Sequence, residues 1–204
     1  MKTGIIQIIC GPMFAGKTSE LIRQIDLALI SKMNIAVFKA KIDNRYKKDC
    51  VCTNDGHSFK SIVIGKSVEI VEHIKKSPKP IEKIFIDEGQ FFDEKIIDVV
   101  TYLTKEKGVD VVITGLIQNF RGEPFGPIPK LMGLAQKVIN LTAICVHEKE
   151  DGSICRKNAY FTQRIINGIP ASYDSPIILV GGADSYTARC EEHWIVPDRP
   201  ETKL

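Results

Sequence analysis

Short apolar runs alternate with amphipathic segments over the first two thirds of the chain. Runs rich in β-branched residues predict strands at 5–10, 35–39, 62–64, 84–87 and 109–115. Apolar residues at helical spacing predict helices at 19–31, 67–76 and 93–107. Continuous apolar residues at 84–86 and 111–113 predict strands covered on both faces. We therefore expect an α/β fold with a mostly parallel sheet and right-handed crossovers.

The pattern changes after about residue 140. Helical periodicity fades, and turns, cysteines and short apolar stretches at 159–165 and 177–180 take over. We expect a first domain at 1–140 and a second, smaller segment at 141–204. Within the first domain, the turn signal Asn54-Asp55-Gly56 predicts a hairpin between 51–53 and 57–62.

A phosphate-binding motif joins the first predicted strand to the first predicted helix. The sequence fits G-x-x-x-x-G-K-[ST] with Gly11, Pro12, Met13, Phe14, Ala15, Gly16, Lys17 and Thr18. The glycines allow backbone N–H groups to converge on phosphate oxygens, while Lys17 supplies a charge and Thr18 a hydroxyl for Mg²⁺. A plain glycine turn is the alternative, which the flanking elements disfavour. The helix should bury one face, formed by Leu21, Ile22, Ile25, Ala28 and Leu29.

A second motif is the apolar run that ends in two acids, Asp87 and Glu88. Such a strand end is typical of a Walker B element, which holds Mg²⁺ directly or through water. On an extended segment the two side chains point in opposite directions. Asp87 would then face the metal and Glu88 an attacking hydroxyl, as its general base. A strand that merely ends at a charged rim would give the same residues.

Composition and charge narrow the class of protein. The chain has 204 residues, 44% of them hydrophobic, and 28 basic against 25 acidic residues give a net charge of +3. This even balance leaves no strong electrostatic footprint for nucleic acid. The densest basic group, which is either a solvated loop or an anion site, is Lys39, Lys41, Arg45, Lys47 and Lys48. No apolar run approaches the roughly 20 residues of a membrane span, so we expect a cytoplasmic protein with reduced thiols.

Three cysteines and a histidine in the second segment form a candidate zinc site. Cys145, Cys155, Cys190 and His193 are the ligand types of structural zinc, and Cys190 and His193 show the familiar two-residue spacing. Nine residues separate Cys145 from Cys155, which suggests an inserted loop. His147 is a rival ligand, and buried cysteines without metal are the alternative. Cys10 is interpreted as strand core, and Cys50 and Cys52 stay unassigned.

Five motifs in order carry a family resemblance. They are 11–18, 87–91 (Asp-Glu-Gly-Gln-Phe), 120–125 (Phe-Arg-Gly-Glu-Pro-Phe), 162–164 (Thr-Gln-Arg) and 180–183 (Val-Gly-Gly-Ala). With these, the chain resembles the type II thymidine kinases nearly from end to end. Three departures are Ile117 in place of a common acid, Arg156 in place of a common glycine, and the long spacing between Cys145 and Cys155.

The resemblance implies a RecA-like P-loop domain followed by a zinc-bearing segment with a lasso loop. The implied reaction transfers the γ-phosphoryl of ATP to the 5′-hydroxyl of thymidine, with Mg²⁺, structural Zn²⁺ and a homotetramer; deoxyuridine stays open as a second substrate. Glu88 and Lys17 would be catalytic. The implied nucleotide contacts are 11–18, Asp43, Arg45, Asp87 and Gln90. The implied thymidine contacts are Phe120, Thr162, Ile177, Ile178, Leu179, Val180, Gly181 and Tyr186.

Two other classes of function compete with this interpretation. A P-loop ATPase or switch would use Glu88 to activate water and would hydrolyse ATP without a nucleoside. A zinc-containing nucleic-acid module is disfavoured because the charge is near neutral and aromatic residues are few in the C-terminal segment. For Phe120, an ordinary core phenylalanine near a turn is the alternative.

Overall fold

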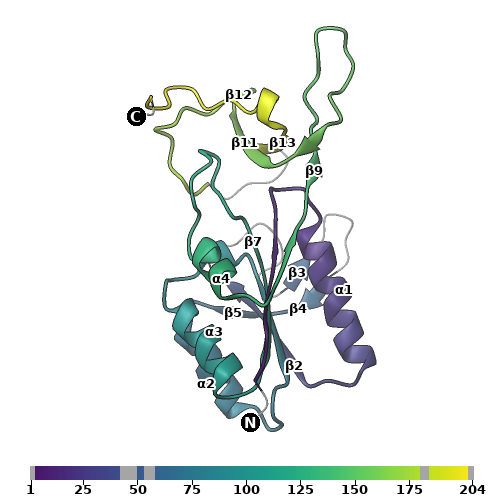
Figure 1. Cartoon of the computed structure of the whole chain (residues 1–204), viewed down its shortest axis with the longest axis vertical. Helices are drawn as coiled ribbons and strands as arrows, with labels where there is room; N and C mark the ends of the chain where they lie inside the picture. Colours follow the sequence, from purple (N-terminus) through teal and green to yellow (C-terminus); the bar gives the residue numbers. More distant parts are fainter. Residues whose placement is uncertain (1–2, 42–49, 53–57, 180–183, 202–204) are drawn as a thin grey trace.

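A six-stranded parallel sheet forms the centre of the protein in the computed structural model, which describes residues 3–41, 50–52, 58–179 and 184–201 (Figure 1). The strand order is β5-β2-β6-β7-β1-β8 and every neighbouring pair is parallel. The strands are β1 (Ile6–Cys10), β2 (Ile35–Ala40), β5 (Ile62–Ile64), β6 (Lys83–Asp87), β7 (Asp110–Gly115) and β8 (Lys137–Asn140). The five predicted strands are confirmed, and the α/β class with a parallel sheet is correct.

Helices cover both faces of this sheet. Helix α1 (Lys17–Ile30) lies on one face, while α2 (Val68–Lys76), α3 (Ile96–Lys105) and α4 (Ile128–Leu134) lie on the other (Figure 1). Alternate strand residues separate into two cores, because successive side chains point to opposite faces. Ile84 and Ile86 join the cluster beneath α2, α3 and α4, whereas Phe85 joins the cluster beneath α1.

Three details of the sequence interpretation need correction in this region. Leu29 is not a core residue, since it is 44% exposed, and the buried face of α1 follows Leu21, Ile25 and Ala28 instead. Helix α4 and strand β8 were not predicted. Helix α4 is short and contains a proline, and three of the four β8 residues are exposed at the sheet edge, so neither has a strong apolar period.

The smaller β elements complete the chain. The predicted hairpin is confirmed as β3 (Cys50–Cys52) paired antiparallel with β4 (Ser58–Lys60). Beyond β8, β9 (Ala143–Ile144) pairs with β10 (Asn158–Ala159), and β11 (Phe161–Ile166) lies between β12 (Ile169–Pro170) and β13 (Tyr186–Arg189). The prediction of a strand at 177–180 is wrong for residues 177–179, which are not in a strand. The carbonyls of Ile177 and Leu179 accept hydrogen bonds from side chains and not from a neighbouring strand.

The cysteines follow the prediction with one exception. Cys10 lies fully buried in β1, as expected, and Cys10, Cys145, Cys155 and Cys190 are free thiols. Cys50 on β3 is disulfide-bonded, so the expectation that all thiols are reduced is wrong there. That expectation came from composition, which carries no information on which sulfur atoms the fold brings together. Within the described residues, no helix is long and apolar enough to cross a membrane.

Candidate active site

The phosphate-binding loop lies at the carboxyl edge of the central sheet, between β1 and α1. A Cβ at Gly11 would lie 2.2 Å from the Leu141 carbonyl oxygen, so the close approach of the two segments requires glycine there. Gly16 adopts φ 79° and caps the start of α1. The Lys17 ammonium is buried and donates a hydrogen bond to the Pro12 carbonyl at 2.7 Å. The loop and the helix N-terminus thus form the surface expected of a phosphate cradle.

Asp87 is the last residue of β6, and Glu88 follows it at the same edge of the sheet. Asp87 is buried and accepts hydrogen bonds from the Thr114 hydroxyl and, at 3.0 Å, from the Glu88 N–H. Glu88 does not continue the strand: its φ of 53° and ψ of 47° lie in the left-handed region. The expectation of an extended Asp87-Glu88 pair is therefore wrong. Glu88 instead forms a turn, in which the Asp87 carboxylate bonds Thr114 and the Glu88 carboxylate bonds Gln90. A non-glycine residue in the left-handed region is strained, and such strain is common at functional sites.

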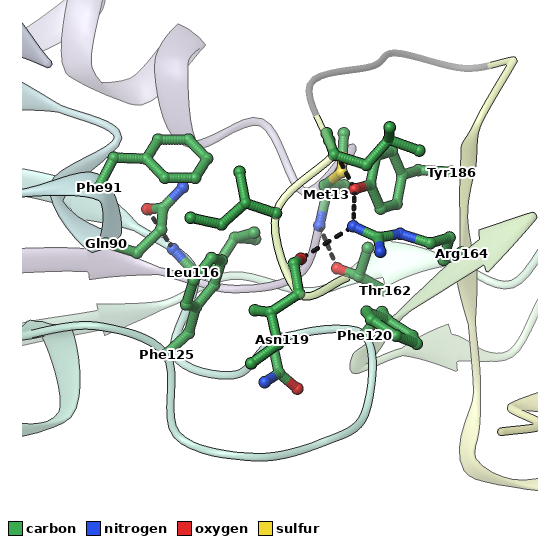
Figure 2. Close-up of a pocket in the computed structure, with 13 residues that line it drawn as sticks. Met13, Gln90, Phe91, Leu116, Asn119, Phe120, Phe125, Thr162, Arg164 and Tyr186 are labelled. Carbon is green, nitrogen blue, oxygen red and sulfur yellow. Dashed lines mark hydrogen bonds between the residues drawn. The ribbon is translucent and has the colours of Figure 1, made fainter. Parts of the chain in front are cut away.

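Gln90 connects Glu88 to a cavity beside the 11–18 loop. Its Oε1 accepts a hydrogen bond from the Leu116 N–H at 3.0 Å, and its Nε2 donates to Glu88 Oε2 at 2.5 Å. Because the backbone fixes the amide oxygen, the amide nitrogen faces the carboxylate. Gln90 was expected beside the nucleotide. The structure places it in the wall of the cavity that also contains Phe120 and Thr162 (Figure 2).

This cavity gathers most of the residues predicted to bind thymidine. Six of the eight line it, namely Phe120, Thr162, Ile177, Ile178, Leu179 and Tyr186. Val180 and Gly181 lie outside the described residues, as do Asp43 and Arg45 from the nucleotide set. Met13 also lines the cavity, so the 11–18 loop contributes to its wall (Figure 2).

The three-stranded sheet β12-β11-β13 supplies one side of the cavity. Thr162 and Arg164 are two residues apart on β11, so they lie on the same face of the sheet. Tyr186 on β13 is the register partner of Arg164. The Thr162 hydroxyl accepts a hydrogen bond from the Met13 N–H at 3.0 Å, which ties this sheet to the phosphate loop. Sequence reasoning assigned no role to Arg164, although it belongs to the Thr162-Gln163-Arg164 motif.

The candidate zinc ligands converge as predicted. The ligand atoms of Cys145, Cys155, Cys190 and His193 all lie within 4.8 Å of one another. His193 Nδ1 is 3.6 Å from Cys145 Sγ and 3.3 Å from Cys190 Sγ, and the sulfurs of Cys155 and Cys190 are 3.9 Å apart. A tetrahedral zinc site has neighbouring ligand atoms about 3.5–3.8 Å apart. The donor set and its spacing therefore fit zinc.

Electrostatics at the cluster agree with this assignment for Cys145. Burial of its thiol raises the pKa, but hydrogen bonds from the Cys190 and His147 backbone and from His193 outweigh burial and lower the pKa to about 6. The thiolate is the form of cysteine that binds metal.

A short hairpin explains the long spacing between the first two cysteines. Lys149 N–H donates to the Ser153 carbonyl at 2.8 Å, and Cys155 N–H donates to the His147 carbonyl at 2.9 Å. The inserted residues fold out as this hairpin, so the cysteines at its base still meet. His147 is not in the ligand cluster; its ring stacks on His193 with centroids 4.0 Å apart.

Arg156, the second departure, lies just after this hairpin. Its φ is 60°, in the left-handed region where glycine carries no steric cost. The position therefore suits the glycine that is common among relatives of the resembled family.

A comparison with known families agrees with the residues just described. The model of a family described as thymidine kinase matches residues 4–194, which contain the phosphate loop, the acid pair, the cavity and the cysteine-histidine cluster. Membership of this family implies a kinase that uses ATP and takes thymidine as a small-molecule substrate. Since the match covers most of the chain, the chain belongs to the thymidine kinase family.

Proposed function

We propose that the protein transfers the γ-phosphoryl group of ATP to the 5′-hydroxyl of thymidine, giving dTMP and ADP for nucleotide salvage. In this proposal Glu88 is the general base and the phosphate loop holds the triphosphate. Phosphoryl transfer needs little covalent help from a protein, so alignment and neutralisation of charge carry most of the rate enhancement.

One observation carries the proposal: Gln90 bridges the Glu88 carboxylate and the cavity. The amide holds Glu88 Oε2 at 2.5 Å while its own oxygen is fixed by the Leu116 N–H. A nucleoside in the cavity would therefore present its sugar toward a carboxylate of fixed orientation. A general base must lie within hydrogen-bond reach of the hydroxyl that it deprotonates.

The phosphate side of the site is proposed from the loop and its neighbours. The loop 11–18 would contact the phosphates through its backbone N–H groups, except at Pro12, which has none, and at Met13, whose N–H bonds Thr162. Lys17 would move from the Pro12 carbonyl to a phosphate oxygen. Thr18 and Asp87 would hold Mg²⁺, which neutralises the charge on the phosphate oxygens when bound. The resemblance adds Asp43 and Arg45 beside the phosphates.

The base side is proposed from the cavity. Phe120 would stack on the thymine, Thr162 would form a wall of the pocket and Tyr186 would contact its edge. The backbone of 177–181 would hydrogen-bond the base. A site built on such hydrogen bonds rejects a wrong base, because buried polar groups would then be left unpaired.

Replacing Glu88 by glutamine tests the mechanism. Glu88→Gln should lower kcat for thymidine about 10²- to 10⁴-fold, the range for a lost general base, with ATP binding retained. Glu94→Gln is the matched control, since Glu94 is exposed and ion-paired with Lys130 at 2.7 Å; it should leave kcat unchanged. Steady-state assays and titration with an ATP analogue give both values.

Two results would contradict this proposal. Undiminished phosphorylation of thymidine by Glu88→Gln would remove the assigned base. Hydrolysis of ATP by the wild-type protein at the same rate with and without nucleosides would favour the ATPase alternative.

We further propose that Cys145, Cys155, Cys190 and His193 hold a structural Zn²⁺, supported by their mutual distances. The ion would cross-link the β9, β10 and β13 segments and would take no part in phosphoryl transfer. The resemblance also favours a homotetramer in the cytoplasm, with 1–140 as the kinase domain and 141–204 as the segment that closes over the nucleoside. Sedimentation velocity would measure the oligomeric state.

A further inference from the structure

Arg164 is a buried arginine whose contacts differ from those of an ordinary structural ion pair. Arg164 lies on β11, the central strand of the small sheet, and is only 1% exposed. Among the described residues no carboxylate forms a salt bridge with it, and its Nε has no hydrogen-bond partner. Burial of an unpaired charge opposes folding. When buried charged residues are replaced by apolar residues of similar volume, the protein is often equally stable or more stable. Stability alone therefore does not account for an arginine here.

The guanidinium instead holds the backbone that covers the cavity. It donates to the Pro176 carbonyl, to the Ile177 carbonyl at 2.8 Å and to the Tyr186 hydroxyl at 2.5 Å. Tyr186 in turn donates to the Leu179 carbonyl at 2.7 Å (Figure 2). Arg164 thus fixes, directly or through Tyr186, three of the five carbonyls of the 175–179 loop.

A second arginine fixes the start of the same loop. Arg121 Nη2 donates to the Ser175 carbonyl at 3.0 Å, and its guanidinium lies 4.5 Å from the Tyr173 ring centroid. The carbonyls of Ser175, Pro176 and Ile177 therefore all accept hydrogen bonds from arginine side chains. A planar guanidinium suits this task because its donors form a rigid fork, which a lysine cannot reproduce.

Arg164 also contacts the wall of the cavity. Its guanidinium carbon lies 4.3 Å from the centroid of the Phe120 ring, and both residues line the cavity together with Ile177 and Leu179 (Figure 2). One side chain therefore joins the covering loop to the aromatic ring beneath it.

We propose that Arg164 is a positioning residue that holds the 175–179 loop in register with Phe120 and thereby sets the affinity for the nucleoside. This inference rests on the proposed nucleoside site. Arg164 acts through the loop backbone and the ring, so its loss weakens thymidine binding more than it slows the chemical step.

The test compares Arg164→Met with the wild-type protein. The methionine keeps an unbranched stem and removes the charge and the donors. We expect the KM for thymidine to rise about 10- to 100-fold, the range for hydrogen bonds to a charged group, with kcat at saturation and the KM for ATP within about threefold. The urea midpoint should stay unchanged or rise, because the unpaired buried charge is gone.

Two further variants complete the design. Arg164→Lys keeps the charge without the fork and should recover only part of the thymidine affinity. Arg199→Met is the matched control: Arg199 also lies over an aromatic ring, at 5.0 Å from the Trp194 centroid, but bonds the Arg121 carbonyl and not the 175–179 loop. It should leave the thymidine KM unchanged.

Limited proteolysis separates failure of this inference from failure of the proposed function. Cleavage at Ile177, Ile178 and Leu179, measured without nucleoside, should be faster in Arg164→Met alone, because the guanidinium no longer holds the loop. Unchanged cleavage, or an unchanged thymidine KM, overturns the inference. So does a urea midpoint that falls together with both KM values, since that result indicates a merely structural role. A wild-type protein that does not phosphorylate thymidine rejects the proposed function, and the nucleoside step of this inference with it.

Discussion

The central sheet and the C-terminal segment keep their shapes by different physical means. Both faces of the central sheet are sealed by large apolar clusters, in which residues such as Ile8, Phe85 and Ile113 have no exposed surface. The cluster of the C-terminal segment consists of Ala143, Cys145, Ala159, Ala188 and Cys190. Alanine buries little apolar area, so the hydrophobic contribution is small there. The second region must therefore depend on its cysteine-histidine cluster and on polar contacts.

This difference matches a division of tasks in the proposed site. The residues assigned to phosphoryl transfer belong to elements packed in the central sheet layer: Lys17 begins α1, Asp87 ends β6 and Glu88 follows it. The residues assigned to the nucleoside come mostly from the C-terminal segment, which has the weaker core. A region held by few apolar contacts opens at low cost in free energy, which suits a part that must admit and release a substrate.

Removal of a metal ligand should give the largest effect, confined to the C-terminal segment. Cys190→Ser should abolish stoichiometric zinc and raise hydrogen exchange throughout β9–β13, because zinc contributes about 10–16 kcal/mol to the folding of small zinc modules. Cys10→Ser, in the β1 core, is the control and should retain zinc. Metal analysis and exchange mass spectrometry measure both. If purified wild-type protein contained no zinc, the C-terminal segment would not depend on a metal ion as stated above.

Truncation of a core aromatic should act on the central sheet instead. Phe85→Ala should lower the free energy of unfolding by about 3–5 kcal/mol, since Phe85 is fully buried beneath α1. Ile144→Ala, in the C-terminal segment, should change it by less than about 0.5 kcal/mol because Ile144 is 53% exposed. Urea titration gives both values. Loss of zinc in Phe85→Ala would show that the two regions unfold together.

The smallest effect is expected at the contact between the regions. Thr162→Val removes the acceptor of the Met13 N–H and should cost about 1 kcal/mol, which corresponds to about a fivefold rise in KM for thymidine and ATP. Thr187→Val is the control, since the Thr187 hydroxyl bonds Arg189 within the small sheet. Steady-state kinetics with each substrate varied in turn measures the change. Unaltered values in Thr162→Val would mean that this hydrogen bond does not couple the regions.

The elements that the sequence predicted well are those with strong patterns. Five strands of the central sheet could be predicted because runs such as 84–86 are apolar on both faces. The phosphate loop could be proposed because its glycines and Lys17 follow a fixed spacing. Helix α4 and β8 were missed because a proline and exposed positions hide their periods. The four candidate metal ligands could be chosen by residue type, although their spacing was unusual, and the structure brings them together.

Several decisive features depend on contacts between residues far apart in the chain. Sequence periodicity could not show that Glu88 leaves the strand in a left-handed turn, since that conformation depends on the surroundings of the residue. Nor could it show that Arg164 meets the carbonyls of 176 and 177, or that Gln90 joins Leu116 to Glu88.

Local spacing and side-chain period are enough to predict the parallel α/β fold, the loop at 11–18 and the four candidate metal ligands. How these parts meet is visible only in the folded chain: the hairpin that brings Cys145 to Cys155, the Thr162 contact with the phosphate loop, and the arginine-held loop over the cavity. Hydrogen bonds between distant segments depend on the packing of the whole chain, which no local pattern records.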